Sequence, residues 1–333
     1  MAGRKLIMGI DGGGSNTRVV IASPEGNIAA YIEDQKAASQ HRDNQATDNV
    51  KAAIRKALSV AGCFPEEICG MAAGIAGYDR DQDLEWVQEL THLPEMTCPK
   101  WHVNDAVAAH YGALMAKPGV VVISGTGSII FGINEEGRYI RNYDYHHYAA
   151  SAARFLAYDA VYEAIAGHTD DTDGRLVRDM LSHWNAADLG ELAILGRNGF
   201  HDDRRERDRT FGAFAPYVTE AAATGSSLAQ AVCDRSIHQI VVGIRLLGRH
   251  FQAETLRVAC IGSVANSTYF QEKLKRVSID DPGRPFRLVD PHFPPVAGSF
   301  LYAMEQLGIP VTDSVLSKLE RTLSEKNRVI VES

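Results

Sequence analysis

The sequence predicts an α/β protein of two related domains, each with a mixed sheet flanked by helices. Two observations predict this fold class. From residue 5 onward, short apolar segments rich in β-branched residues alternate with segments of helical spacing. A unit of strand, glycine loop and strand near the N-terminus then returns after Pro118.

The N-terminal domain opens on two strands joined by a glycine loop. Residues 5–10 and 17–22 are apolar and β-rich, and the loop between them reads DGGGSN. The turn SPEGN precedes a third strand over residues 28–32. Next come a helix at 47–61, a buried strand in CGMAAGIAG, a helix at 81–90, a strand in KWHVND and a helix in AVAAHYGALMA.

The pattern restarts in the second domain. Residues 119–123 form a strand, SGTGS a loop, 129–133 a second strand, NEEGR a turn and 139–140 the start of a third strand. This internal repeat predicts a domain boundary near residue 118. The alignment pairs Asp11 with Ser124, Gly12 with Gly125, Gly14 with Gly127 and Ser15 with Ser128.

The rest of the chain completes this second domain and returns to the first. Residues 149–249 read as mostly helical, and the alternating charges of HDDRRERDR at 201–209 indicate a solvated surface. A strand at 256–261, the loop GSVANS, a helix at 269–277, a strand at 287–289 and helices at 299–307 and 313–326 follow. We therefore expect domains at 1–117 and 118–298, with a helical insertion at about 150–250. C-terminal helices at 299–333 follow, the first packing back on the N-terminal domain.

Composition excludes several classes of protein. A net charge of −8 disfavours a nucleic-acid binder. No apolar run approaches the roughly 20 residues of a membrane helix, and the N-terminus does not read as a signal peptide, so we expect a cytoplasmic protein. Five scattered cysteines without C-x-x-C spacing indicate reduced thiols rather than disulfides or a zinc site.

The paired glycine loops favour phosphate binding. Glycine lets backbone N–H groups approach an anion closely, although one Gly-Gly turn is also explained by turn geometry alone. Neither loop matches a P-loop, and neither leads into a helix as a dinucleotide fingerprint does. Asp11 precedes the first glycines, where a carboxylate would repel phosphate, so the sequence implies an intervening Mg²⁺ held mainly through water.

Asp105 lies between a predicted strand and a predicted helix. One interpretation is a helix N-cap. The other is a base that accepts a hydroxyl proton during phosphoryl transfer. The two are compatible, since a helix N-terminus favours an ionised carboxylate.

With these residues in place, the chain resembles the N-acetylglucosamine kinase and BadF/BadG/BcrA/BcrD ATPase family of the actin-like sugar-kinase superfamily. MGIDGGGSNTRVVI and VVVISGTGSIIFG resemble its two phosphate motifs. AAGIAGYDRDQD, VNDAVAAHYGA, ACIGSVANS and PPVAGSFLYA resemble its other motifs. The resemblance implies ribonuclease H-like domains with a nucleotide cleft between them, use of ATP and Mg²⁺, and often a homodimer.

Carried over position by position, the resemblance assigns roles to single residues. Asp11 would organise Mg²⁺, and Asp105 would be the base for a hydroxyl of a carbohydrate-like acceptor. Gln40, Gly77, Asp105 and Thr126 would contact that acceptor. The nucleotide would be held by Gly13, Gly14, Ser15, Asn16 and Thr17, by Gly125, Thr126 and Gly127, and by Gly262, Ser263 and Val264 around the adenosine.

The sequence departs from the family after the second phosphate motif. Relatives carry an acidic Asp-Glu-Gly-Ser stretch there, whereas this chain has Tyr148-Ala149-Ala150-Ser151, preceded by RNYDYHHY. Three interpretations of NYDYHHY stay open: a structural aromatic patch, an altered acceptor pocket and a metal site. The acceptor pocket would use Tyr143, Tyr145, His146 or Tyr148, with Asp144 as a displaced carboxylate. The metal site is disfavoured, because adjacent histidines in an extended segment point to opposite faces.

Three functions follow as hypotheses. The first is an ATP-dependent kinase of a small hydroxylated acceptor, most closely an amino sugar. The second is a non-catalytic or regulatory protein of the same fold that binds sugar or nucleotide. The third is an ATPase activator of a dehydratase or reductase, which the absence of paired cysteines disfavours.

Overall fold

A computed structural model describes residues 4–40, 43–280 and 285–331. The chain divides into two compact units, Met1–Lys117 with Pro291–Ser333 and Pro118–Asp290. The chain crosses from the first unit to the second after Lys117, beside the predicted boundary at 117. The second crossing lies after Asp290 rather than after residue 298.

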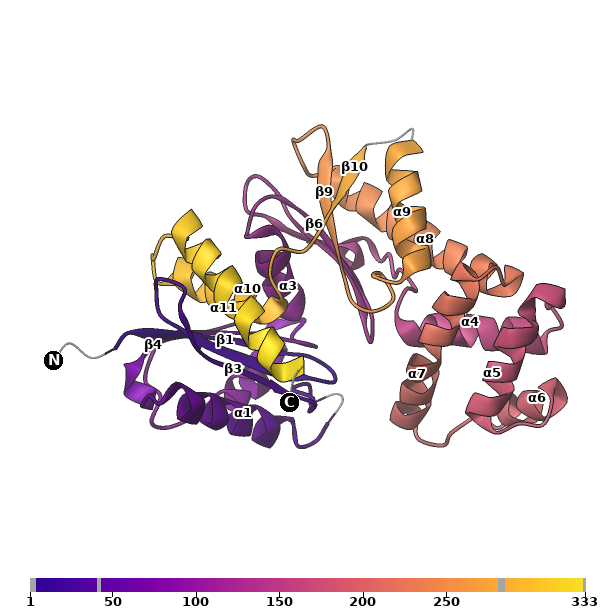
Figure 1. Cartoon of the computed structure of the whole chain (residues 1–333), viewed down its shortest axis with the longest axis horizontal. Helices are drawn as coiled ribbons and strands as arrows, with labels where there is room; N and C mark the ends of the chain where they lie inside the picture. The colour runs from indigo at the N-terminus through magenta and orange to yellow at the C-terminus, as the bar shows by residue number, and fades with distance from the viewer. Residues whose placement is uncertain (1–3, 41–42, 281–284, 332–333) are drawn as a thin grey trace. The chain divides into compact units, whose positions relative to one another are not determined.

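The first unit contains a five-stranded sheet in the order β3-β2-β1-β4-β5 (Figure 1). β1 pairs antiparallel with β2 and parallel with β4, as a hairpin followed by a helical crossover requires. The bounds are β1 Leu6–Gly12, β2 Thr17–Ala22, β3 Ile28–Asp34, β4 Ile68–Ile75, β5 Lys100–Asn104, α1 Ala46–Ala61, α2 Leu84–Leu90, α3 Asp105–Leu114, α10 Pro295–Gln306 and α11 Asp313–Val331.

The two faces of this sheet carry different helices (Figure 1). Met8 and Ile10 share a core with α1, on one face. Because side chains alternate along a strand, Gly9 and Asp11 belong to the other face. There, a β-carbon on Gly9 would lie 2.6 Å from the backbone of Phe300 in α10. Asp11 therefore points toward the face that α10 covers.

Helices α3 and α10 cross at very short range. A β-carbon on Gly298 would lie 1.9 Å from the carbonyl oxygen of Ala108, and one on Gly112 would lie 2.7 Å from that of Pro294. Ser299 fixes α10 to the sheet, because its hydroxyl donates a 2.6 Å hydrogen bond to the carbonyl of Ile10. The predicted return of the C-terminal helix to the first unit thus has a direct structural basis. The helix begins at Pro295 rather than at residue 299, since proline suits the first turn.

The second unit contains a sheet in the order β10-β9-β6-β7-β8, in which β6 again pairs antiparallel with the next strand and parallel with a crossover strand. This arrangement repeats that of the first unit, as the paired glycine loops predicted. The bounds are β6 Gly119–Ser124, β7 Ser128–Ile133, β8 Tyr139–Arg141, β9 Leu256–Ile261, β10 Phe286–Val289 and α9 Thr268–Asp280.

Five helices occupy most of the predicted insertion between β8 and β9 (Figure 1). Asp203, inside the charge-rich segment, caps α7 by accepting from the N–H groups of Arg205 and Glu206. Within the described ranges, no helix is long and apolar enough to cross a membrane. The bounds are α4 Ala153–Ile165, α5 Gly174–Trp184, α6 Leu189–Arg197, α7 Arg204–Ala223 and α8 Ser227–Gly248.

Candidate active site

The first glycine loop closes the β1–β2 hairpin. The Gly13 N–H donates to the carbonyl of Asn16 over 2.9 Å, and the Gly13 carbonyl accepts from the N–H of Ala38 over 3.0 Å. Gly14 and Asn16 are half-buried and Ser15 is exposed, so backbone N–H groups of the loop are within reach of a ligand. Thr17 is buried and its hydroxyl donates to the carbonyl of Lys36 over 2.8 Å, which holds the base of the loop.

Asp11 stands opposite Arg18 in the hairpin register. Arg18 Nη1 lies 3.2 Å from Asp11 Oδ2, and the same guanidinium binds Glu33 with its Nη2 at 2.7 Å. Burial raises the pKa of Asp11, and the charge of Arg18 acts against that increase. The carboxylate is 6% exposed. Asp11 is therefore a nearly buried acid whose ionised form depends on one cation.

Asp105 is the first residue of α3. The N-cap is Asn104, whose side chain accepts from the N–H of Ala106 over 2.9 Å, so the N-cap interpretation of Asp105 is wrong by one position. Gly74 lets α3 approach the sheet, because a β-carbon there would lie 2.4 Å from the β-carbon of Ala108, and the α-carbon of Asp105 would lie 3.6 Å away. Gly74 is also the register partner of Asp11 in the parallel β1–β4 pair. The two predicted acids therefore come together in the first unit.

The electrostatics of Asp105 differ from the sequence prediction. Burial raises the pKa of Asp105 to about 7, and the neighbouring charges of Asp11 and Asp79 add to the increase. The N–H groups at the start of α3 lower this pKa, but they do not offset burial. The helix N-terminus alone thus does not keep the carboxylate ionised. A pKa near neutrality instead suits a group that gains and loses a proton during catalysis.

The loop after β4 lies beside these acids. Gly77 adopts a φ of +86°, which only glycine adopts without strain. The Asn104 amide donates to Asp79 Oδ1 and to the Tyr78 carbonyl, each over 3.0 Å, which fixes this loop to the start of α3. Gln40 is exposed and its amide lies 3.5 Å from the hydroxyl of Thr47. Acceptor contacts at Gly77 and Gln40 stay predictions.

In the second unit, the loops that follow β6 and β9 contact each other. The loop after β6 carries the second phosphate motif, and the loop after β9 carries the residues that the resemblance assigns to the adenosine. The Ser124 carbonyl accepts from the N–H groups of Val264 and Ala265, over 3.1 and 3.2 Å. A β-carbon on Gly262, whose φ is +101°, would lie 2.3 Å from that carbonyl oxygen. A β-carbon on Gly125 would lie 3.5 Å from the α-carbon of Gly262. Ser263, in place of the glycine common in relatives, is exposed.

The tip of the second glycine loop is open to solvent. Thr126 and Gly127 are exposed, and a β-carbon on Gly127 would meet nothing within 4 Å. The Arg154 guanidinium donates to the Thr126 carbonyl over 3.2 Å, and the Ala153 N–H donates to the Gly125 carbonyl over 2.7 Å. The start of α4 therefore holds the loop through these two hydrogen bonds.

Most side chains of NYDYHHY have structural partners within the second unit. Asp144 closes a short helical turn by accepting from the N–H and guanidinium of Arg141. Tyr145 contacts His250. His147 Nε2 lies 3.2 Å from Gln239 Oε1. The described residues contain no group of three or more metal-ligating side chains, here or elsewhere.

Tyr148 is more exposed than Tyr145 in the same segment. It is 67% exposed, and its ring lies 5.4 Å from that of Tyr143, whose hydroxyl donates to the Ser128 carbonyl beside the glycine loop. The Ser128 hydroxyl in turn donates to the Ala149 carbonyl over 3.0 Å. The chain thus presents an unburied aromatic ring next to the second phosphate motif.

Sequence reasoning missed Arg18, Asp79 and Arg154. The signal for Arg18 was present, because counting outward from the glycine loop pairs position 18 with position 11. Asp79 lies within the quoted AGYDRDQD segment but has no pattern of its own. Arg154 binds the Thr126 carbonyl of the second glycine loop. Neither the spacing of Arg154 nor its residue type predicts that contact.

Curated proteins that are similar to this chain in sequence are kinases. The chain is 32% identical over 142 residues to the N-acetylmuramic acid/N-acetylglucosamine kinase of Clostridium acetobutylicum, covering 41% of this chain and 45% of that protein. It is 31% identical over 150 residues to the N-acetyl-D-glucosamine kinase of Dictyostelium discoideum, covering 40% and 45%. These alignments span less than half the length of the curated relatives.

The fold matches solved structures over nearly the whole chain. A candidate N-acetylglucosamine kinase from Chromobacterium violaceum superimposes with a TM-score of 0.70 at 21% identity, covering 90% of this chain and 98% of that chain. Both units thus have the actin-like fold. The sequence profile of the BadF/BadG/BcrA/BcrD ATPase family matches residues 8–303. The chain belongs to the BadF/BadG/BcrA/BcrD ATPase family.

Proposed function

We propose that the protein is an ATP-dependent kinase that phosphorylates a hydroxyl of a small carbohydrate-like acceptor, most closely an amino sugar. The observation that carries this proposal is Asp105, at the start of α3, with a pKa of about 7 and next to the strand that bears Asp11. Membership of an ATPase family, together with an acid of this chain whose pKa is near neutrality, supports acid–base chemistry on an acceptor.

In the proposed reaction, Asp105 receives the proton of the acceptor hydroxyl. The acceptor oxygen forms a bond to the γ-phosphorus of ATP as the bond from that phosphorus to the ADP oxygen breaks. Asp105 must be ionised to accept the proton, and its pKa places a large fraction in that form at neutral pH. Asp79 and Asn104 act as positioning residues that hold the neighbouring loop.

Asp11 is the residue that would hold Mg²⁺. Its carboxylate is nearly buried, next to another acid, and balanced by Arg18 alone among the contacts described for it. No cage of three or more acidic, histidine or cysteine side chains lies within the described ranges, which fits an ion held by one carboxylate, water and phosphate oxygens. Such an ion would neutralise charge on the transferring phosphoryl group.

The glycine loops would supply the remaining phosphate contacts. Backbone N–H groups of Gly14, Ser15 and Asn16 would serve from the first unit, and those of Thr126 and Gly127 from the second, because the N–H groups of Gly13 and Gly125 already donate within their own loops. Gly262, Ser263 and Val264 would border the adenosine, because Gly262 brings the backbone close to the Ser124 carbonyl. Both loops offer donors without intervening side chains, which favours an anionic ligand.

An amino-sugar acceptor is favoured by the names of the relatives in Clostridium acetobutylicum and Dictyostelium discoideum. The acceptor side of this chain differs from the family pattern at Tyr148-Ala149-Ala150. We assign Tyr148 to stacking on an apolar face of the acceptor, since it is exposed beside the loop. Asp144 is less suited to bind the acceptor as a displaced carboxylate, because Arg141 already binds its side chain.

A coupled ADP-release screen tests the proposal. The panel comprises glucosamine, N-acetylglucosamine, N-acetylmannosamine, N-acetylmuramic acid, anhydro sugars and nucleosides, each with ATP and Mg²⁺. We expect at least one amino sugar to raise ADP release above the acceptor-free rate, and Asp105→Asn to abolish the increase. Acceptor-independent ADP release with every compound would contradict the kinase assignment.

A regulatory protein that binds nucleotide or sugar without turnover is the second candidate. The absence of a carboxylate at positions 148–150 favours it, because the resemblance to the family implies acidic residues there. Tight nucleotide binding without phosphorylation of any panel member would support this alternative. A cytoplasmic location is an expectation from the apolar pattern of the sequence, and a homodimer is one from the resemblance. Size-exclusion chromatography with light scattering tests the second.

A further inference from the structure

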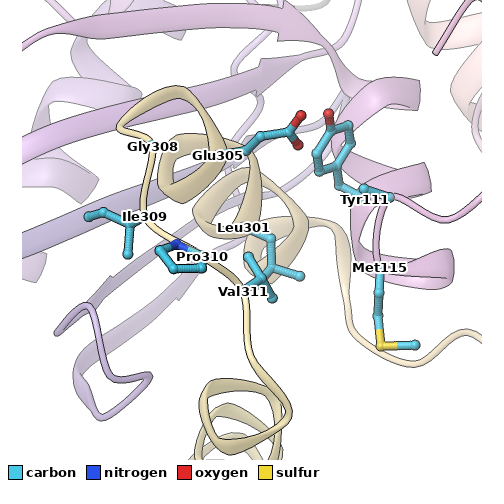
Figure 2. Close-up of a pocket in the computed structure, with 9 residues that line it drawn as sticks. Tyr111, Met115, Leu301, Glu305, Gly308, Ile309, Pro310 and Val311 are labelled. Carbon is cyan, nitrogen blue, oxygen red and sulfur yellow. The ribbon is translucent and has the colours of Figure 1, made fainter. Parts of the chain in front are cut away.

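The first unit contains a pocket far along α3 from Asp105. It has a volume of about 400 Å³, within the range of small-molecule sites. Figure 2 shows Met115 from the end of α3, Leu301 and Glu305 from α10, and the segment that follows α10. The residues lining the pocket are Tyr111, Met115, Ala116, Leu301, Glu305, Gly308, Ile309, Pro310 and Val311.

The walls are apolar and the polar groups gather at one end. Val311 keeps 39% of its surface exposed at the pocket, although it is aliphatic. The Glu305 carboxylate and the Tyr111 hydroxyl point toward the same end (Figure 2). Glu305 is exposed, and in the part of the chain that the structure describes no side chain forms an ion pair with it.

Two further sources add negative charge to the walls of the pocket. α3 ends at Leu114 and α10 ends at Gln306, so the carboxyl ends of two helices lie at the pocket. Each helix carries a partial negative charge at that end. Together with Glu305, these ends favour a cation, whereas the walls favour an apolar body.

The pocket also adjoins the chain crossings between the two units. Met115 and Ala116 line it, with φ angles of +54° and +55°, and the first crossing follows immediately at Lys117. After the second crossing, the N–H groups of His292 and Phe293 donate to the carbonyls of Ala113 and Gly112, at the end of α3. A non-glycine residue in the left-handed region stores about 1–3 kcal/mol of strain. The conformation of this segment is therefore sensitive to what fills the pocket.

We propose that this pocket binds a small amphipathic cation, an ammonium group on a compact apolar body. The ammonium group lies at Glu305 and Tyr111, and the apolar body packs on Leu301, Ile309 and Val311. Occupancy acts as an effector, because it fixes Met115 and Ala116 and thereby the end of the helix that begins at Asp105. The binding claim goes beyond the proposed kinase activity and is tested without nucleotide or sugar.

The binding test uses three probes of one shape and different charge: tryptamine, tryptophol and indole-3-acetate. Calorimetry or ligand-observed NMR on the full chain measures their dissociation constants. We expect tryptamine to bind about tenfold more tightly than tryptophol, and indole-3-acetate to bind more weakly than either. Equal binding of the three probes, or no binding of tryptamine at about 10 mM, would overturn the site.

Two variants locate the site. Glu305→Gln should remove the preference for tryptamine over tryptophol while keeping the pocket, and Val311→Trp should block all three probes by filling it. Glu320→Gln is the matched control, because Glu320 is an exposed glutamate of α11 outside the pocket. Circular dichroism shows whether each variant is folded. An unchanged tryptamine preference in folded Glu305→Gln would place the cation elsewhere.

The effector claim has its own readout. With the acceptor found in the ADP-release screen, saturating tryptamine should change KM for ATP or kcat by at least about twofold. The change should vanish in Glu305→Gln and persist in Glu320→Gln. Tryptamine that binds in the pocket without altering either constant would leave a binding site and refute the effector role. Because binding is measured alone, failure of the kinase assignment leaves the binding result intact.

Discussion

Asp11 and Arg18 face each other across the β1–β2 hairpin, with Arg18 Nη1 3.2 Å from Asp11 Oδ2. The pair joins the acid proposed to hold Mg²⁺ to a cation. The glycine-loop motif does not predict this ion pair. Removing one partner of a nearly buried ion pair leaves the other charge uncompensated, so the acid takes up a proton.

Arg18→Ala should weaken binding of Mg²⁺-ATP about tenfold, because Asp11 then spends more time protonated. Arg18→Lys should lose less, since it keeps the charge but not the fork that also binds Glu33. Calorimetric titration with a non-hydrolysable ATP analogue measures this. Arg55→Ala, an exposed arginine of α1, is the matched control. Equal affinity in Arg18→Ala and Arg55→Ala would show that Arg18 does not support Asp11.

Asp105→Asn should lower kcat by about 10²–10⁴-fold, the usual contribution of a general base. The same variant should be more stable than wild type at pH 8, by about 1–3 kcal/mol. The native pKa of about 7 lies above the unfolded value, so ionised Asp105 destabilises the fold above pH 7. The gain should shrink as the pH falls through 7 and disappear below about 4, where the acid is neutral in both states.

Chemical denaturation at pH 5 and pH 8 measures this stability difference. Asp202→Asn, an exposed aspartate outside the site, is the control and should behave like wild type at both values. An Asp105→Asn protein that is inactive and less stable at pH 8 would contradict the raised pKa. One that retains activity would contradict the role as base.

The pH dependence of kcat/KM should show an acid limb near pH 7, because activity requires ionised Asp105 in the free enzyme. Asp79→Asn should move this limb about half a unit to lower pH, since one negative neighbour is removed. Asparagine keeps an oxygen that can accept from Asn104, so the loop stays in place. A limb that does not move, or that moves to higher pH, would exclude Asp79 as a contributor.

Tyr148→Ala should raise the acceptor KM about five- to tenfold and leave KM for ATP unchanged, because its ring is assigned to the acceptor. Tyr145→Ala is the matched control from the same segment, since Tyr145 contacts His250 instead. Steady-state kinetics with each substrate varied separately measures both constants. Equal effects of the two substitutions would mean that NYDYHHY is only a structural aromatic patch.

Gly262→Ala should destabilise the second unit by about 3 kcal/mol or more and weaken nucleotide binding. Gly225→Ala is a close control, because both glycines have a φ of +101° but only Gly262 has a carbonyl 2.3 Å from the new β-carbon. Gly225→Ala should therefore cost about 1–2 kcal/mol, from backbone strain alone. Equal losses would show that the Ser124 carbonyl moves aside freely.

Sequence patterns predicted the strands of both sheets well, because the alternation of apolar segments with glycine loops and turns is strong there. They also singled out Asp11 and Asp105 as acids of the proposed site. They gave the wrong ionisation for Asp105, since its pKa depends on burial and on Asp11 and Asp79, which tertiary packing brings close. Propensity rules placed Asp105 at the N-cap, whereas Asn104 occupies it because its amide also holds the Tyr78 loop.

The segment NYDYHHY shows the limit of sequence reasoning. Its composition permitted a metal site, a binding surface or a packed patch, and the partners of its side chains lie far along the chain. Tyr145 and His147 contact residues about a hundred positions away in the chain, which no local pattern reveals. The exposure of Tyr148 is likewise a result of packing.

The proposed kinase activity is tested most directly by following the γ-phosphoryl group of ATP. ATP labelled at the γ-phosphate is incubated with the protein, Mg²⁺ and the acceptor found in the screen, and mass spectrometry identifies the product. We expect wild type to transfer one label to an acceptor hydroxyl, and Asp105→Asn to transfer none under conditions in which both bind nucleotide equally. Label recovered only in inorganic phosphate, or equal transfer by Asp105→Asn, would contradict this expectation.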